Sequence, residues 1–252
     1  RELIMESRVL IAAAGISYLT EQMRANFVSR YPFLATKPAA VIPNGFDEED
    51  FQNPKPGSSR EIFHLVYSGS FYDRRQPDPL WQAILGLVES GSLDPASIAV
   101  DIFGKNTVSF VLGRFAQNET IRRMVRFHKF QPHRRNLQEL MRAGALLLFI
   151  PSGKNTRSVL TGKIFDYLRS GRPILAIVPP DGIAAEMVTR AGTGFVADYQ
   201  DIAGIGQNLL RLYQMWRSGE LETLKPDLEY VAGFSRERLA AKLAALIEEV
   251  AL

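Results

Sequence analysis

The sequence predicts an α/β fold in which helices cover both faces of a parallel β-sheet. Six short runs rich in Ile, Leu and Val follow residue 62, helical stretches lie between most of them, and the runs show little polar alternation. Their spacing of about 26 residues is typical of βαβ units, and unbroken apolar strands are typical of a sheet buried on both faces. We therefore predict a Rossmann-like, doubly wound layer.

Before the linker, we expect a buried strand at residues 9–14 and then a helix that ends at Tyr31. Helical geometry is disfavoured at Tyr31 because a proline follows it. A short strand is expected at residues 40–42. Residues 48–61 are rich in Pro, Gly, Ser and acidic residues, as linkers are, so we place the main boundary there.

Strands and helices are expected to alternate beyond the linker. The strand candidates are residues 63–67, 98–103, 124–130, 145–150, 173–177 and 194–196. The helix candidates are residues 80–89, 109–115, 137–142, 164–170 and 184–191. Two further helices are expected at residues 200–218 and 236–250, the second with Ser235 as its N-cap.

Composition excludes several classes of protein. There is no cysteine, which rules out disulfide scaffolds and thiolate metal sites. The longest charge-free run, residues 9–20, is too short to span a bilayer, and the chain starts without a signal-peptide pattern. A soluble, cytoplasmic type of domain is expected. The histidines leave little material for a metal centre, and His128 and His133 are interpreted as surface or packing residues.

The net charge of +3 is unevenly placed. Between Lys105 and Arg135 there are eight Lys or Arg residues and one acid, Glu119. Such a run suits phosphate, nucleic acid or an anionic membrane surface, and a solvated basic face is an equally good interpretation. Little aromatic interleaving and no nucleic-acid-binding module argue against nucleic acid, which leaves peripheral membrane contact as the more plausible use.

A candidate ligand site lies in the segment that follows the strand at residues 145–150. A polar loop leads into a helix that opens at Thr161, Gly162 and Lys163. A helix start points free N–H groups and a positive dipole end over the carboxyl edge of the sheet, where open α/β sheets bind phosphates. Lys163 would add a full charge there. The alternative is that Lys163 is solvated.

The segment that starts at Gly162, Gly-Lys-Ile-Phe-Asp-Tyr-Leu-Arg-Ser-Gly-Arg-Pro, resembles the Lys-Leu-Phe-Glu-Tyr-Leu-Ala-x-Gly-Lys-Pro stretch of GT-B glycosyltransferases of the group 1, family 4 type. Residues 41–47 resemble their Ile-Pro-Asn-Gly-Val-Asp linker, and residues 65–70 resemble the first strand and glycine turn of their C-terminal domain. Residues 143–152 and 234–237 resemble a further strand and the closing helix. The blocks occur in the family's order over nearly the whole chain.

The resemblance implies that the chain is the C-terminal half of a GT-B fold. Residues 1–47 would be the tail of the N-terminal acceptor-binding lobe and the interdomain connection, residues 48–231 the nucleotide-sugar-binding domain, and residues 232–252 the closing helix. It implies a retaining transferase of polysaccharide biosynthesis that moves a sugar from a UDP- or GDP-linked donor to a saccharide or lipid-linked acceptor. No cofactor or metal is implied, and the fragment would be inactive alone.

The resemblance also implies roles for single residues. Asp166 matches the second acid of the Glu-x7-Glu motif, which binds the nucleotide ribose. Arg75 falls where the diphosphate-binding lysine lies, and Phe130 and Gln131 fall where backbone groups hold the base. The expected donor-binding set is Gly69, Ser70, Arg74, Arg75, Lys105, Phe130, Gln131, Ser158, Thr161, Gly162, Lys163 and Asp166.

Two positions depart from the family pattern. The first acid of the Glu-x7-Glu motif falls at Ser158, and the arginine expected after the glycine turn is Ser70. Phosphate charge would then be met by the Lys and Arg residues of the donor-binding set. The same departures support a second hypothesis, a non-catalytic nucleotide-binding or assembly module on the same fold. No catalytic residue is assigned.

Overall fold

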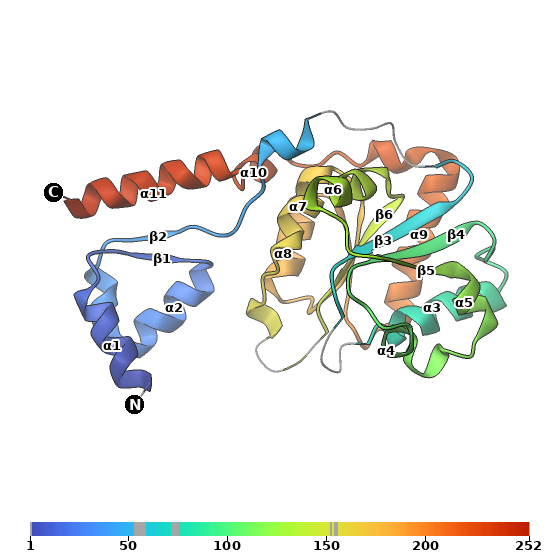
Figure 1. Cartoon of the computed structure of the whole chain (residues 1–252), viewed down its shortest axis with the longest axis horizontal. Helices are drawn as coiled ribbons and strands as arrows, with labels where there is room; N and C mark the ends of the chain where they lie inside the picture. Colours follow the sequence, from blue (N-terminus) through green and yellow to red (C-terminus); the bar gives the residue numbers. More distant parts are fainter. Residues whose placement is uncertain (1, 53–58, 72–75, 152, 154–155, 252) are drawn as a thin grey trace. The chain divides into compact units, whose positions relative to one another are not determined.

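The computed structural model describes residues 2–52, 59–71, 76–151, 153 and 156–251. The chain divides into two compact units (Figure 1). The small unit consists of residues 1–48 and 232–252, and the large unit of residues 49–231. Each unit is described by itself.

A six-stranded sheet forms the centre of the large unit. In chain order the strands are β3 (Phe63–Ser68), β4 (Ile98–Phe103), β5 (Val125–His128), β6 (Ala145–Phe149), β7 (Ile174–Ile177) and β8 (Gly194–Ala197). They lie in the order β5-β4-β3-β6-β7-β8, and every neighbouring pair is parallel. The order reverses between β3 and β6, which makes this the topological switch point of a doubly wound sheet. The predicted fold class is confirmed.

Helices cover both faces of this sheet. Figure 1 shows α3 (Asp78–Glu89) and α9 (Ile202–Ser218) on one side and α6 (His133–Arg142), α7 (Lys163–Ser170) and α8 (Ile183–Arg190) on the other. Apolar side chains of α3 and α9, with Trp81 fully buried, pack on the strand residues of the first face. Shorter helices complete the unit: α4 (Val108–Leu112), α5 (Glu119–Met124) and α10 (Leu228–Ala232).

One predicted strand boundary is wrong. Residues 124–130 were expected to form a single strand, but Met124 ends helix α5 and β5 ends at His128. The Asn118 side chain accepts a hydrogen bond from the backbone N–H of Ile121 and so caps the start of α5. A run of apolar residues does not reveal where such a short helix gives way to a strand.

The small unit is built from α1 (Glu2–Ala12), β1 (Ile16–Tyr18), α2 (Glu21–Arg30), β2 (Ala39–Val41) and α11 (Arg236–Ala251). Strands β1 and β2 pair in parallel, and α11 contacts β2. Ser235 caps α11, because its hydroxyl oxygen accepts from the backbone N–H of Arg238 at 3.4 Å. This cap was predicted from the sequence.

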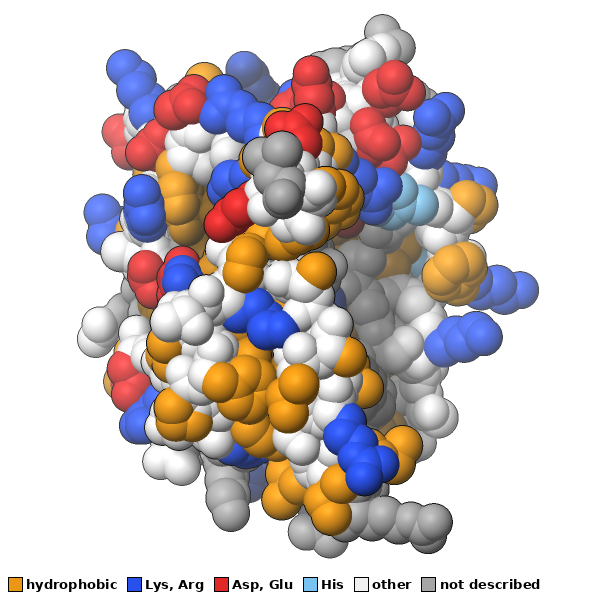
Figure 2. Space-filling model, turned by 90° about the vertical axis from the view of Figure 1, so that its left-hand side faces the viewer, with side chains coloured by type: hydrophobic (Ala, Val, Ile, Leu, Met, Phe, Trp, Pro, Cys, Tyr) orange, Lys and Arg blue, Asp and Glu red, His pale blue; other side chains and the backbone are white. Residues whose placement is uncertain are grey.

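The strand expected at residues 9–14 is wrong, because that run continues helix α1. The residues before it, Glu, Leu, Met, Ser and Arg among them, mostly favour a helix, and an apolar run alone does not distinguish a strand from a helix. Hydrophobic side chains of α1 are 60 to 68% exposed: Leu3, Ile4, Met5, Val9 and Ile11. Figure 2 shows hydrophobic side chains gathered on the face turned toward the viewer. Within the described residues, no helix has the length and apolar character needed to cross a membrane.

Candidate functional site

The candidate site lies where β3 and β6 end, at the switch point of the sheet. Gly69 and Ser70 follow β3 directly. The chain leaves β6 and returns as α7, whose first residue is Lys163. Open α/β sheets bind ligands outside the carboxyl ends of their strands at such a point. The glycine turn and the start of α7 therefore occupy the expected place for a ligand.

Gly69 and Lys163 lie in direct contact at this edge. Gly69 has a φ of +139°, a backbone conformation that side chains rarely permit. A Cβ atom placed on it would lie 2.5 Å from Nζ of Lys163. A Cβ atom there would force the end of the lysine side chain to move, so glycine allows the ammonium group to lie directly against the turn.

Lys163 is half-buried and carries its charge against an aromatic ring. Its Nζ lies 4.0 Å from the ring centroid of Tyr67, a cation–π distance. Burial lowers the pKa of Lys163 to about 8, since the charged form loses solvation. Lys163 is thus only partly solvated, in contrast with the solvated lysine of the alternative interpretation. An anion bound beside this group would restore its preference for the charged form.

Asn106, which follows the neighbouring strand β4, holds the glycine turn in place with two hydrogen bonds. Its Nδ2 donates to the carbonyl oxygen of Gly69 at 2.9 Å, and its Oδ1 accepts from the backbone N–H of Phe71 at 2.8 Å. Gly104 packs so closely that a Cβ atom there would lie 2.6 Å from the Gly69 oxygen. The turns after β3 and β4 are thereby interlocked.

Helix α7 is fixed to the end of β3 by Tyr167, in the middle of the helix. This fully buried phenol accepts a hydrogen bond from the backbone N–H of Ser68 at 2.9 Å. Burial raises the pKa of Tyr167 far above its ordinary value, so the hydroxyl stays protonated. The Ser68 hydroxyl donates to Oδ1 of Asn136 on α6 at 3.0 Å. Residue spacing gives no signal for these contacts, and the predicted set contains neither Tyr167 nor Asn136.

Two further predicted residues share the start of α7 with Lys163. Asp166 lies in the first turn, where the helix dipole favours an acid, and it already interacts with other groups of the chain. Because Asp166 is three positions after Lys163, both project on the same side of the helix. Oγ1 of Thr161 is shielded from solvent and has no hydrogen-bond partner among the described residues. A ligand oxygen at this point would give it one.

The other predicted residues lie along the same edge or beyond the described part. Lys105 is exposed after β4, and Phe130 is 72% exposed after β5, with Gln131 next to it. Ser158 is exposed in the loop before α7. These residues come from three separate loops and take no part in the contact between Gly69 and Lys163. Arg74 and Arg75 lie outside the described residues.

Metal ligands do not gather at this edge. Across the described ranges, no group of three or more His, Asp and Glu side chains is placed to hold a metal ion. The polar groups that surround Gly69 are an ammonium, amides and hydroxyls. Such donors suit an anionic ligand.

The sheet order and this edge define a Rossmann-like domain that matches half of a GT-B fold, the fold of group 1 glycosyltransferases. No family model matches the sequence, and no curated protein matches it either. The expected resemblance to glycosyltransferases is confirmed through solved structures, at the level of the fold.

Three solved structures illustrate the match. Sucrose-phosphate synthase from Thermosynechococcus elongatus has a TM-score of 0.68 at 15% identity, covering 98% of this chain and 61% of its own. WaaG, a glycosyltransferase involved in lipopolysaccharide biosynthesis, has a TM-score of 0.63 at 16% identity and covers 91% and 61%. A mutant of S. aureus TarM in complex with UDP has a TM-score of 0.65 at 14% identity and covers 92% and 43%. The chain thus spans about half the length of the chains it matches.

Proposed function

We propose that the large unit binds the nucleotide-sugar donor of a glycosyltransferase and that the small unit contains the end of an acceptor-binding lobe. The single observation that carries the proposal is the Lys163 ammonium, held over the Gly69 turn at the switch point of a GT-B-like sheet. The bound UDP in the TarM structure, a protein with the same fold, supports this assignment.

The donor's diphosphate would lie between the Gly69 turn and the start of α7. When the bond between the sugar and the β-phosphate oxygen breaks, negative charge develops on the leaving diphosphate. The Lys163 ammonium and the N–H groups at the start of α7 oppose that charge, and the Thr161 hydroxyl can donate to a phosphate oxygen. Asp166 would accept from the ribose hydroxyls, and the segment of Phe130 and Gln131 would hold the base. Arg74, Arg75 and Lys105 would supply further positive charge.

The reaction would be a sugar transfer to a saccharide or lipid-linked acceptor, with retention of the anomeric configuration. Binding energy from the base and the diphosphate would place the sugar for attack, which supplies much of the rate enhancement in reactions of this kind. The acceptor and its activating groups would come from the other lobe. The chain alone would then bind the donor without transferring it.

The binding of nucleotides tests this proposal. In a calorimetric titration with UDP, GDP, ADP and CMP, we expect one nucleoside diphosphate to bind at least tenfold more tightly than the others. Asp166→Ala should weaken that binding about tenfold, because the ribose loses a charge-assisted acceptor. Lys225→Gln, an exposed lysine of the same unit, is the control and should bind like the wild type. Equal or absent binding for all four nucleotides would contradict the proposal.

The alternative function is a nucleotide-binding or assembly module without activity. Serine at positions 70 and 158, where the family has an arginine and an acid, favours it. Hydrolysis or transfer of the donor sugar by a protein that also contains the acceptor lobe would exclude this alternative. Binding without turnover in that longer protein would support it.

We also propose that the large unit contacts an anionic cytoplasmic membrane surface. Exposed basic residues of the run from Lys105 to Arg135 include Arg122, Arg123, Arg126 and Lys129. A charged lipid surface attracts such residues by about 1 kcal/mol each. Co-sedimentation with phosphatidylglycerol vesicles at low salt, and its loss with phosphatidylcholine vesicles, is the expected result. Equal recovery with both vesicle types would contradict it.

A further inference from the structure

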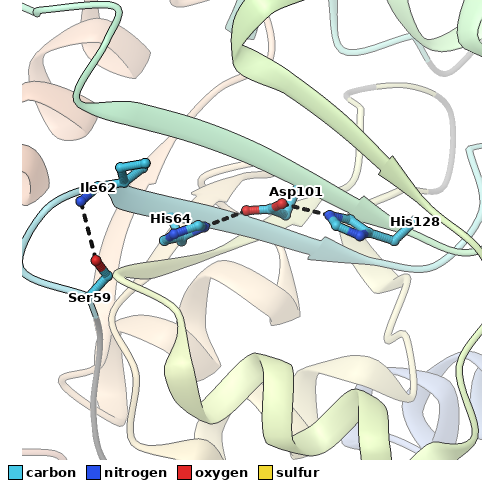
Figure 3. Close-up of polar contacts among 5 residues, drawn as sticks. All are labelled: Ser59, Ile62, His64, Asp101 and His128. Carbon is cyan, nitrogen blue, oxygen red and sulfur yellow. Dashed lines mark hydrogen bonds and ion pairs between the residues drawn. The ribbon is translucent and has the colours of Figure 1, made fainter.

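A buried carboxylate joins two histidines across three strands of the large unit (Figure 3). Nδ1 of His64 lies 2.6 Å from Oδ2 of Asp101, and Nε2 of His128 lies 2.6 Å from Oδ1 of the same residue. Asp101 is only 4% exposed, whereas the side chains of His64 and His128 are 27% and 36% exposed. The cluster therefore has a buried centre and two ends that reach solvent.

The strand register explains why these three residues meet. Asp101 on β4 pairs with Val66 on β3 and with Arg126 on β5. His64 and His128 are each two residues away from those partners, so all three side chains project from the same face of the sheet. The cluster forms a diagonal row that connects the three strands on one side of the switch point.

The charge on Asp101 fixes the protons of the two rings. Burial opposes ionisation, but hydrogen bonds from His64 and His128 outweigh it and hold the pKa of Asp101 below its ordinary value. An ionised carboxylate only accepts hydrogen bonds, so both contacting nitrogens must donate. Neutral His64 therefore carries its proton on Nδ1 and neutral His128 on Nε2. A second proton would enter at Nε2 of His64 and Nδ1 of His128.

Other charged groups lie on the elements around the cluster. Arg126 is in register with Asp101 on β5 and is exposed, and Arg60 and Glu61 precede β3. On α6, which contacts β3, His133 and Arg134 pair with Asp50, and Arg142 pairs with Glu139. The remaining cations nearby in sequence are Lys105, Lys129 and Arg135. The groups that lower the pKa of Asp101 are the two histidines, through their hydrogen bonds and then through their charges.

His128 links the cluster to the proposed donor site. Its ring stacks on Phe103 with centroids 4.3 Å apart, and its carbonyl oxygen accepts from the backbone N–H of Gly104 at 3.3 Å. Gly104 packs on the carbonyl of Gly69, the residue that receives Lys163. Direct contacts therefore connect the end of β5 with the glycine turn.

We infer that His64, Asp101 and His128 form a positioning cluster that makes donor affinity depend on pH. This inference rests on the proposed function of the switch-point site. The bonds to the ionised carboxylate are charge-assisted already, and protonation of a ring adds a positive charge to the donor, so that an ion pair strengthens the contact. His64 at the start of β3, Asp101 within β4 and His128 at the end of β5 are then held together more tightly, and positive charge appears on His128 at the strand-end edge where an anion is expected. Affinity for a nucleotide therefore rises as pH falls through the range in which histidine titrates.

Nuclear magnetic resonance of the ¹⁵N-histidine-labelled chain tests the cluster without any nucleotide. At pH 7.5 we expect His64 protonated on Nδ1 and His128 on Nε2. On acidification, the backbone amide signal of Gly104 should move with the titration of His128. In His128→Gln, whose amide nitrogen can still donate to Asp101 but does not titrate, that movement should vanish. The opposite tautomers, or an unchanged Gly104 titration in the variant, would overturn the inference.

A second arm measures the effect on binding. Affinity for UDP and GDP is compared between pH 7.5 and 5.5 in the wild type and His128→Gln, with exposed His133→Gln as the control. The phosphate groups of the nucleotide also titrate, so affinities are compared as the ratio of wild-type affinity to variant affinity. This ratio should increase at least threefold between pH 7.5 and pH 5.5. His133→Gln should follow the wild type. A constant ratio would overturn the inference, whereas no binding at any pH would overturn the proposed function and leave the resonance experiment to decide on the cluster.

Discussion

At the scale of single residues, the surroundings of Lys163 are unfavourable for its positive charge as long as no ligand is bound. Its ammonium lies against the Tyr67 ring and over Gly69, and burial lowers its pKa to about 8. A charged group in such a place reduces stability, whereas a ligand anion uses the same charge for binding. We therefore expect Lys163 to serve binding at the expense of stability.

The pH dependence of binding follows from this pKa. An anion binds the protonated ammonium, and with a pKa of about 8 only about a tenth of Lys163 is charged at pH 9. We predict that affinity for a nucleoside diphosphate falls about tenfold between pH 7 and pH 9. Lys163→Met should bind weakly at both values and show no such fall. Calorimetric titration at the two pH values checks this, and an equal fall in the variant would contradict it.

Lys163→Met, which should weaken binding, should increase the stability of the fold. Because folding lowers the pKa of Lys163 from its ordinary 10.5, the unfolded chain binds more protons between pH 8 and 10.5, and wild-type stability rises with pH in that window. Below pH 8 the full penalty is present. We predict that Lys163→Met raises the free energy of unfolding at pH 7 by about 1 to 3 kcal/mol, and that the gain shrinks above pH 8. Urea denaturation at pH 7 and pH 10 measures it.

Gly69 provides a second test at this scale. Alanine there would be strained by the positive φ and would also approach Nζ of Lys163. At Gly171 φ is +67°, but no atom lies within 4 Å of the position that a Cβ atom would take, so Gly171→Ala adds strain without a contact. We predict that Gly69→Ala lowers stability by about 1 to 3 kcal/mol and abolishes diphosphate binding. Gly171→Ala should lower stability by about 1 kcal/mol and bind normally. Equal diphosphate binding by both variants would show that the contact between Gly69 and Lys163 is not needed for binding.

At the scale of elements, long-range hydrogen bonds hold the site together. Tyr167 joins α7 to β3, Asn106 joins the turn after β4 to the turn after β3, and Asp101 joins three strands. Most strands and helices of the large unit were predicted from the sequence, because a run of apolar residues indicates a buried element by itself. These three residues were missed because their partners are far away along the chain. Gly69 and Lys163 were both predicted, whereas their contact was not.

Tyr167→Phe tests the bond between α7 and β3. The backbone N–H of Ser68 would lose its partner inside the protein, which costs about 1 to 3 kcal/mol. We predict this loss together with weaker nucleotide binding, since Lys163 sits on the loosened helix. Tyr213→Phe is the matched control, because its hydroxyl bonds to Ser97 on another part of the unit. Tyr213→Phe should lower the free energy of unfolding without changing the affinity for the nucleotide. Identical nucleotide affinities in the two variants would contradict the proposed role of Tyr167.

Asp101→Asn tests the connection among three strands. The pKa of Asp101 is lower in the folded chain, so its contribution to stability is present above pH 4 and is lost as pH falls through the folded value. The asparagine amide can accept from only one histidine in full and presents a donor to the other. We predict a loss of about 3 kcal/mol at pH 7 and a smaller further loss between pH 4 and pH 2 than in the wild type. Acid unfolding followed by circular dichroism measures both.

At the scale of the whole molecule, the two units differ in how completely they cover their apolar residues. The large unit has a continuous core, whereas α1 of the small unit leaves most of its hydrophobic side chains exposed. The sequence predicted a buried strand in this region because the run from Val9 to Ala14 has no charge. The composition of a segment indicates that its side chains favour burial, but it does not indicate which surface they pack against.

The proposed function depends above all on the binding of a diphosphate by Lys163 at the switch-point edge of the large unit. The most direct measurement is a calorimetric titration of the wild type and Lys163→Met with a nucleoside diphosphate and with the corresponding monophosphate. We expect the wild type to bind the diphosphate at least tenfold more tightly than the monophosphate, a difference of about 1.4 kcal/mol, and the variant to show little preference. Equal affinity of the wild type for both nucleotides, or an undiminished preference in Lys163→Met, would contradict it.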